Sequence, residues 1–128
     1  MTQTLARRAP WRVLAVASLT LLAIRAMWGF ERREVTGASM TPTLSPGDRV
    51  LFRRIGRRPV RDGSIVLVVD PRDGATELIK RVTAVDGQVA WVVGDNPGAS
   101  TDSRTFGWVP RAHLRAVMVR RYARAPLS

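Results

Sequence analysis

The stretch ELIKRVTAVDGQVAWVV, residues 77–93, contains two β-like runs separated by an Asp-Gly turn. The runs are Glu77–Val85 and Val89–Val93, and Asp86-Gly87 lies between them. Three further runs of this kind are Arg49–Ile55, Ser64–Val69 and Leu114–Tyr122, with Gly-Asp or Asp-Gly pairs at 47–48, 62–63 and 73–74. This part of the sequence contains neither a convincing amphipathic helix nor an internal repeat. The pattern predicts a mostly β domain, built as a curled sheet or small barrel.

An apolar segment precedes the β-like part of the chain. Val13–Ile24 is free of charge, and after Arg25 the apolar character continues to Phe30. As a helix, this segment would be about 27 Å long, near the lower limit for crossing a bilayer. Arg25 lies close enough to the end for its side chain to reach the interface, and Trp11 and Trp28 bracket the segment as interfacial aromatics do. We therefore expect a single membrane anchor.

The apolar segment has two other interpretations. A cleavable secretory signal would need a small-x-small site, and the following RAMWGFERRE offers no good one. A buried soluble helix is the second alternative. The arginines at positions 7, 8 and 12, with no acid nearby, suit a cytoplasmic end, although Arg32 and Arg33 weaken this orientation signal. We expect residues 1–34 to form a cytoplasmic tip, anchor and linker, and residues 35–128 a β-rich domain on the extracytoplasmic side.

Almost all of the basic residues are arginine. The net charge is +11, and Lys80 is the only lysine among the 21 basic residues. Arginine stays protonated in proteins, whereas burial can make a lysine neutral. Strand alternation places Lys80 on one face with Leu78 and Val82, where its amine could be desolvated. The strand pattern alone nevertheless favours a lysine at a sheet edge with its amine in water.

Several classes of chemistry are excluded by composition. The chain has no cysteine, so disulfides, thiolate metal sites and a cysteine nucleophile are absent. His113 is the single histidine, and we expect it at the surface. No metal or cofactor site is visible in the sequence. The arginines are spread along the chain and stacking aromatics are few, so the charge suits anionic lipids of a bilayer and not nucleic acid.

Three stretches together resemble one family. GASMTPTLSPGDRV (37–50), the Lys80-Arg81-Val82 strand and GDNPGASTDSRTFGWV (94–109) follow in this order. They are similar to type I signal peptidases (peptidase family S26), membrane serine endopeptidases with a Ser-Lys dyad, in a minimal bacterial form. The matched motifs are Ser39-Met40-Thr41-Pro42-Thr43-Leu44, Gly47-Asp48, Lys80-Arg81-Val82, Gly94-Asp95-Asn96 and Ser100-Thr101-Asp102-Ser103-Arg104.

The resemblance implies a role for each matched residue. It makes Ser39 the nucleophile, Lys80 the general base and Ser100 the residue that orients the lysine amine. It also implies two supporting ion pairs, Asp95 with Arg81 and Asp102 with Arg104. The side chains expected to line a pocket for small substrate residues are Met40, Leu44, Leu78 and Ile79.

The chain departs from the family pattern in two places. Gly37 stands where some members carry a hydroxyl residue that helps the oxyanion hole, which leaves backbone N–H groups such as that of Ser39. After Val82 the sequence reads Thr83-Ala84-Val85-Asp86-Gly87 instead of the usual Gly-x-Pro-Gly-Asp-like turn. The local turn geometry is therefore expected to differ.

The resemblance implies removal of N-terminal signal peptides from exported preproteins, with small residues before the cleavage site, at a bacterial cell membrane. One alternative is a dedicated maturation protease for the leader of nickel-containing superoxide dismutase, whose members carry a similar 94–107 loop. A second alternative, from another class, is a catalytically inactive, basic, membrane-anchored β-domain. The sequence does not identify natural substrates or the oligomeric state.

Overall fold

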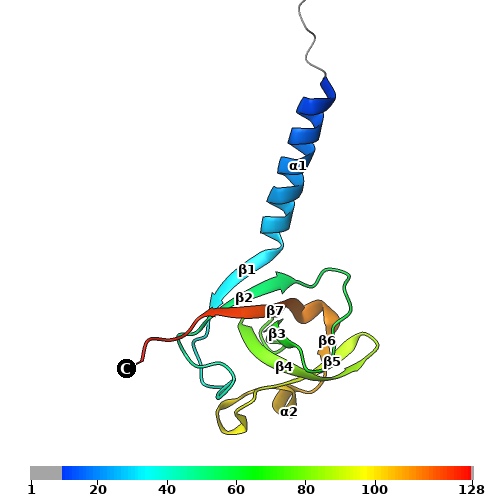
Figure 1. Cartoon of the computed structure of the whole chain (residues 1–128). Coiled ribbons are helices and arrows are strands. Elements are labelled where there is room, and N and C mark those ends of the chain that lie inside the picture. The colour runs from blue at the N-terminus through cyan, green and yellow to red at the C-terminus, as the bar shows by residue number, and fades with distance from the viewer. Residues whose placement is uncertain (1–9, 128) are drawn as a thin grey trace, which may run out of the picture.

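The computed structural model describes residues 10–127. Its first element is an isolated apolar helix, α1 (Pro10–Trp28), which leaves the rest of the molecule as a straight rod (Figure 1). The helix is long and apolar enough to cross a bilayer, with a mean hydropathy of 1.4, and none of its residues is buried. Nineteen exposed helical residues of this composition need an apolar surrounding that the rest of the described chain does not provide.

The predicted apolar helix is confirmed, but its boundaries differ. The helix begins at Pro10 and ends at Trp28, so Phe30 belongs to a strand. Proline suits the first turn of a helix because its missing N–H would have no partner there. The arginines at positions 7 and 8, which were expected to mark the cytoplasmic end of the anchor, lie outside the described residues.

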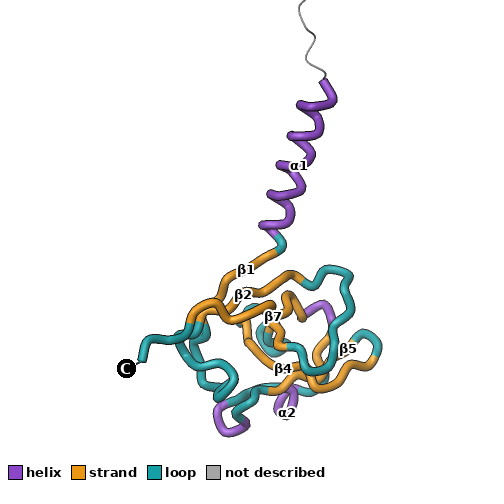
Figure 2. The backbone as a smooth tube through the Cα atoms, viewed as in Figure 1, coloured by secondary structure: helices purple, strands orange, loops and turns teal. Residues whose placement is uncertain are grey.

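The rest of the chain forms one curled, seven-stranded antiparallel sheet (Figures 1 and 2). The spatial order is β1-β2-β7-β3-β4-β5-β6, so the last strand lies between β2 and β3. Register shifts interrupt the β2–β7, β3–β7 and β4–β5 ladders, and such irregularities bend a sheet. The strands are β1 (Phe30–Glu34), β2 (Arg49–Arg54), β3 (Ile65–Val69), β4 (Glu77–Asp86), β5 (Val89–Val93), β6 (Val109–Pro110) and β7 (Leu114–Ala123).

All five expected strands are present, and two others were not predicted. β1 (FERRE) has no apolar alternation, and its residues pair with β2 from Phe30 opposite Arg53 to Glu34 opposite Arg49. β6 is only two residues long and includes Pro110. β1 lies before the expected domain boundary at residue 35, and that boundary stays a prediction.

The sheet buries both faces of its middle strand. β3 reads IVLVV, and its side chains alternate between two apolar clusters. Val66 and Val68 belong to one cluster, while Ile65 and Leu67 belong to the other. A strand buried on both faces reads as a continuous apolar run, which explains this segment.

The polar loop after β5 contains two short helical turns, η1 (Pro97–Ala99) and α2 (Ser103–Phe106). Asp102 caps α2, because its carboxylate accepts a hydrogen bond from the Arg104 backbone N–H. A third turn, η2 (Arg111–His113), precedes β7. His113, expected at the surface, is half-buried, and its Nδ1 lies 3.2 Å from the Val69 carbonyl oxygen. The carbonyl can only accept, so Nδ1 is the donor.

Candidate active site

Lys80 is buried at the inner face of β4. Its side chain is only 3% exposed, and Val82 on the same face is fully buried, in agreement with strand alternation. Burial is the main cause that lowers the pKa of the Lys80 amine. The Asp102 carboxylate opposes this shift, and the Arg104 guanidinium supports it. The amine is therefore biased towards its neutral form, unlike a lysine at a sheet edge in water.

A short hydrogen-bond chain joins Lys80 to Asp102. Lys80 Nζ donates to Ser100 Oγ at 3.1 Å, and Ser100 Oγ donates to Asp102 Oδ2 at 2.5 Å. An ionised carboxylate can only accept, which fixes the direction of both hydrogen bonds. Because Ser100 takes one N–H of the amine, the nitrogen lone pair of a neutral Lys80 is free for another proton donor.

Asp102 anchors the loop beneath the lysine. Its side chain has no solvent exposure and also accepts hydrogen bonds from the Gly94 N–H at 2.8 Å and from Arg104 Nε at 2.9 Å. Burial alone would raise the pKa of this carboxyl. The hydrogen bonds from Arg104, Gly94 and Ser100 outweigh burial and hold the pKa well below its ordinary value. Asp102 is thus charged. Its negative charge alone would favour a protonated Lys80, and the positive charge of its ion-pair partner Arg104 offsets this effect.

Ser39 is held by the same loop. The Asn96 backbone N–H donates to the Ser39 carbonyl oxygen at 2.8 Å, and the Asn96 side chain donates to the Ala38 carbonyl oxygen and to Thr41 Oγ1. Among the described residues, no acceptor is found for the Ser39 N–H itself. This N–H is therefore available to a bound group.

Gly94 lies where no side chain fits. An added Cβ would be 2.6 Å from both the Ser39 carbonyl oxygen and Ser100 Cβ. Heavy atoms do not approach this closely without displacement. The missing side chain therefore lets the segments that carry Ser39 and Ser100 meet at one point.

A cleft of about 210 Å³ opens beside these residues. Ser39 and Lys80 both line it, between the chain that follows β1 and the first half of β4. Its apolar walls are Val35, Met40, Leu67, Leu78 and Ile79. Arg33 and Glu77 also line the cleft, and their ion pair at 3.0 Å links β1 to β4. A space of this size suits small apolar side chains of an extended peptide.

A second ion pair supports the cleft from the other side of β4. Arg81 donates to both carboxylate oxygens of Asp95, at 2.9 and 2.7 Å. The Thr43 hydroxyl donates to Asp95 at 2.6 Å. This fork keeps the pKa of Asp95 below its ordinary value and ties the segment after Ser39 to β4.

The structure brings most of the expected site residues together. Ser39, Met40, Leu78, Ile79 and Lys80 line one cleft, and both expected ion pairs are present. Leu44 is an exception, because it is 1% exposed in the core cluster and does not line the cleft.

Sequence reasoning assigned no role to several residues that shape the site. These residues are Arg33, Thr43, Glu77, Gly94 and Asn96. Thr43, Gly94 and Asn96 belong to matched motifs, and this was the signal that could have pointed to them. Within residues 10–127, no group of three or more His, Asp or Glu side chains could hold a metal ion.

The chain matches a known protein family. The family described as signal peptidase, peptidase S26, matches residues 8–90, which is more than half of the chain. The chain belongs to this family.

Its relatives include components of mitochondrial proteases. Mitochondrial inner membrane protease subunit 2 of Mus musculus is 34% identical over 106 residues, covering 64% of this chain and 61% of the relative. Mitochondrial ATP-independent inner membrane protease subunit 1a of Arabidopsis thaliana is 32% identical, covering 72% and 70%. Subunit 1 of the Saccharomyces cerevisiae protease is 28% identical, covering 82% and 74%. The chain spans about three fifths of the length of the mouse, bovine and human subunit 2 proteins.

Proposed function

We propose that the chain is a membrane-anchored serine endopeptidase that removes N-terminal signal peptides, with Ser39 as nucleophile and Lys80 as general base. The observation that carries this proposal is the buried Lys80 amine, hydrogen-bonded to Ser100 in the cleft that Ser39 also lines. A serine hydroxyl becomes reactive when a neighbouring base takes its proton. Arginine could not serve, because it stays protonated.

The first step is attack on the scissile carbonyl carbon. Ser39 Oγ forms the new C–O bond while its proton passes to the lone pair of Lys80 Nζ. The carbonyl π electrons move to oxygen, and the Ser39 N–H donates to the oxyanion. Gly37 brings no side chain to this point, so the oxyanion depends on the backbone.

The second half of the reaction uses the same lysine. The Lys80 ammonium gives its proton to the leaving amine as the C–N bond breaks, which leaves an acyl ester on Ser39. A water molecule then attacks the ester, its proton passes to Lys80, and Ser39 recovers its proton as the acid product leaves. Ser100 keeps the amine in position throughout both halves.

The proposed substrates are preproteins with small residues before the cleavage site. The small apolar cleft supports this class. Only β1 separates α1 from the segment that carries Ser39, and such substrates are presented at a bilayer surface. A bacterial cell membrane with the β domain on the extracytoplasmic side remains part of the proposal, and the relatives named above are mitochondrial.

Cleavage of a preprotein with an Ala-x-Ala junction in liposomes tests the proposal, with Lys80→Arg and Ser39→Ala compared with the unaltered chain. Lys80→Arg keeps the charge but removes the base, so cleavage should stop in both variants. Equal cleavage by Lys80→Arg would refute the assigned base.

Failure of the unaltered chain would direct attention to the two alternatives. A nickel superoxide dismutase leader is then the next substrate. If that leader is also left uncut, the chain is an inactive anchored β-domain. The anchor helix favours signal peptides over a leader that is processed without general secretion.

A further inference from the structure

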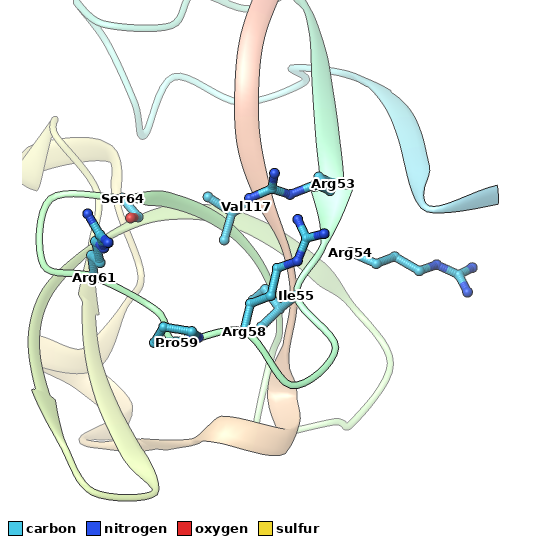
Figure 3. A pocket seen from close by; sticks show the side chains of 8 residues that line it. All are labelled: Arg53, Arg54, Ile55, Arg58, Pro59, Arg61, Ser64 and Val117. Atoms are coloured by element: carbon cyan, nitrogen blue, oxygen red, sulfur yellow. The ribbon is translucent and has the colours of Figure 1, made fainter. Parts of the chain in front are cut away.

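Five arginines fall between positions 53 and 61, at the end of β2 and in the loop that follows. Four of them line a pocket of about 390 Å³ that is separate from the cleft of Ser39 and Lys80. In Figure 3 the side chains of Arg53, Arg58 and Arg61 gather around this pocket, whereas Arg54 points away. The other lining residues are Ile55, Pro59, Ser64 and Val117. We refer to this feature as the arginine pocket.

The arginine pocket lacks the counter-charges found elsewhere. Arg54 pairs with Glu31 at 3.0 Å, but Arg53, Arg58 and Arg61 have no carboxylate within 4.0 Å among residues 10–127. The other paired arginines of the described chain are Arg33, Arg72, Arg81, Arg104, Arg115 and Arg121. Like charges gathered without partners repel one another, and a bound anion removes that repulsion.

The arginine pocket lies at the foot of the anchor helix. A neighbouring groove shares Arg53 and Arg58 with it and reaches Arg25 and Gly29 at the end of α1. The Arg54 N–H also donates to the Gly29 carbonyl oxygen at 2.8 Å. If α1 crosses a bilayer, these residues are at the level of the lipid headgroups.

We propose that the arginine pocket binds the phosphodiester headgroup of an anionic phospholipid in the leaflet that faces the β domain. Guanidinium forks match phosphate oxygens in two-point hydrogen bonds, and the Ser64 hydroxyl is a further donor. Ile55, Pro59 and Val117 form an apolar wall for the glycerol and the start of the acyl chains. No aromatic side chain lines the pocket, so it offers no platform on which nucleic-acid bases would stack.

Binding of phosphatidylglycerol to the full chain in neutral detergent micelles tests this site. Native mass spectrometry across a lipid titration counts the molecules retained on the protein. We compare the unaltered chain with the triple variant Arg53→Gln, Arg58→Gln and Arg61→Gln. At roughly fivefold in affinity for each well-placed basic residue, the triple variant should bind about a hundredfold more weakly.

A matched control removes the same charge elsewhere. Arg49, Arg120 and Arg124 are exposed, have no ion-pair partner among residues 10–127, and do not line the arginine pocket. Their triple change to glutamine should leave phosphatidylglycerol retention within about twofold of the unaltered chain, because few of these residues would be near the headgroups.

Three results would overturn the proposal. One is equal lipid retention by the unaltered chain and the pocket variant, and another is an equal loss in the control variant. The third is tighter binding of inorganic phosphate or of a single-stranded oligonucleotide than of phosphatidylglycerol. Thermal unfolding checks that the pocket variant folds. If it does not, Arg53→Gln and Arg61→Gln are measured singly, each with an expected loss of about fivefold.

Discussion

Gly94→Ala is a test of the site that removes no chemical group. The added Cβ would lie 2.6 Å from the Ser39 carbonyl oxygen and from Ser100 Cβ, where ordinary contacts begin near 3.4 Å. Ser100 Oγ would be closer still to the added Cβ, so these neighbours, or Gly94 itself, must move by at least about 0.8 Å. A displacement of about 1 Å at a catalytic group can cost about a hundredfold in rate, and we expect a loss of this order in kcat.

The fold should survive this change at a moderate cost. Inserting a methyl group into a packed site costs about 1–3 kcal/mol, which is less than the stability of most domains. Gly98→Ala is the matched control in the same loop, because its added Cβ would have only Asn96 Oδ1 nearby, at 3.8 Å. Cleavage kinetics and thermal unfolding are measured on both variants. Full activity of Gly94→Ala would refute the idea that this close approach positions Ser39 and Ser100.

Three further changes have defined outcomes. Arg104→Gln removes a positive charge that lowers the pKa of Lys80, so the rising limb of the pH–rate profile should move to higher pH. Asp102→Asn should lower the free energy of unfolding by about 2–3 kcal/mol at neutral pH in urea titrations, because it weakens charge-assisted hydrogen bonds. Its deficit should shrink on acidification: the lowered pKa of Asp102 gives the unaltered chain stability above the unfolded pKa that is lost as pH falls through the folded pKa. Asn96→Ala removes the bonds to Ala38 and Thr41 and should lower kcat about tenfold in cleavage assays.

Each of these three predictions has an outcome that would contradict it. An unmoved pH profile in Arg104→Gln would mean that its charge does not act on Lys80. A constant stability deficit of Asp102→Asn across pH would mean that its carboxylate does not provide the linkage. Thr101→Ala, an exposed position in the same loop, is the control for Asn96→Ala, and equal kcat losses in both would point to a general loop effect.

The sequence predicted the apolar helix and five strands because their residues carry strong patterns. Continuous valine-rich or alternating runs identify strands whatever their partners are. β1 was missed because FERRE carries charge at four of its five positions, and its strand form comes from pairing with β2. This is a tertiary effect that no local pattern reports.

Site residues could be predicted from the sequence where a motif specifies the residue type. They could not be predicted where packing of the whole sheet determines the burial and direction of a side chain. The lone Lys80 and the motif around Ser39 pointed to one cleft. The burial that lowers the pKa of Lys80 depends on the whole sheet, and strand alternation alone favoured a solvated amine. Leu44 shows the reverse case, because its place in the Ser39 motif suggested the cleft while its side chain fills the core.

The position of β7 has a consequence for the biogenesis of the protein. β7 follows the other six strands of the described sheet in sequence, and it alone joins β1 and β2 to the other four. The segment with Ser39 follows β1 and precedes β2, whereas Lys80 lies on β4. Until residues 114–123 pair, no strand ladder joins β1 and β2 to β4, and only loop and side-chain contacts such as the Arg33–Glu77 ion pair connect the Ser39 segment to the strand of Lys80. Under the proposed function, the cleft that brings Ser39 and Lys80 together is therefore complete in a nascent chain only after this strand has paired.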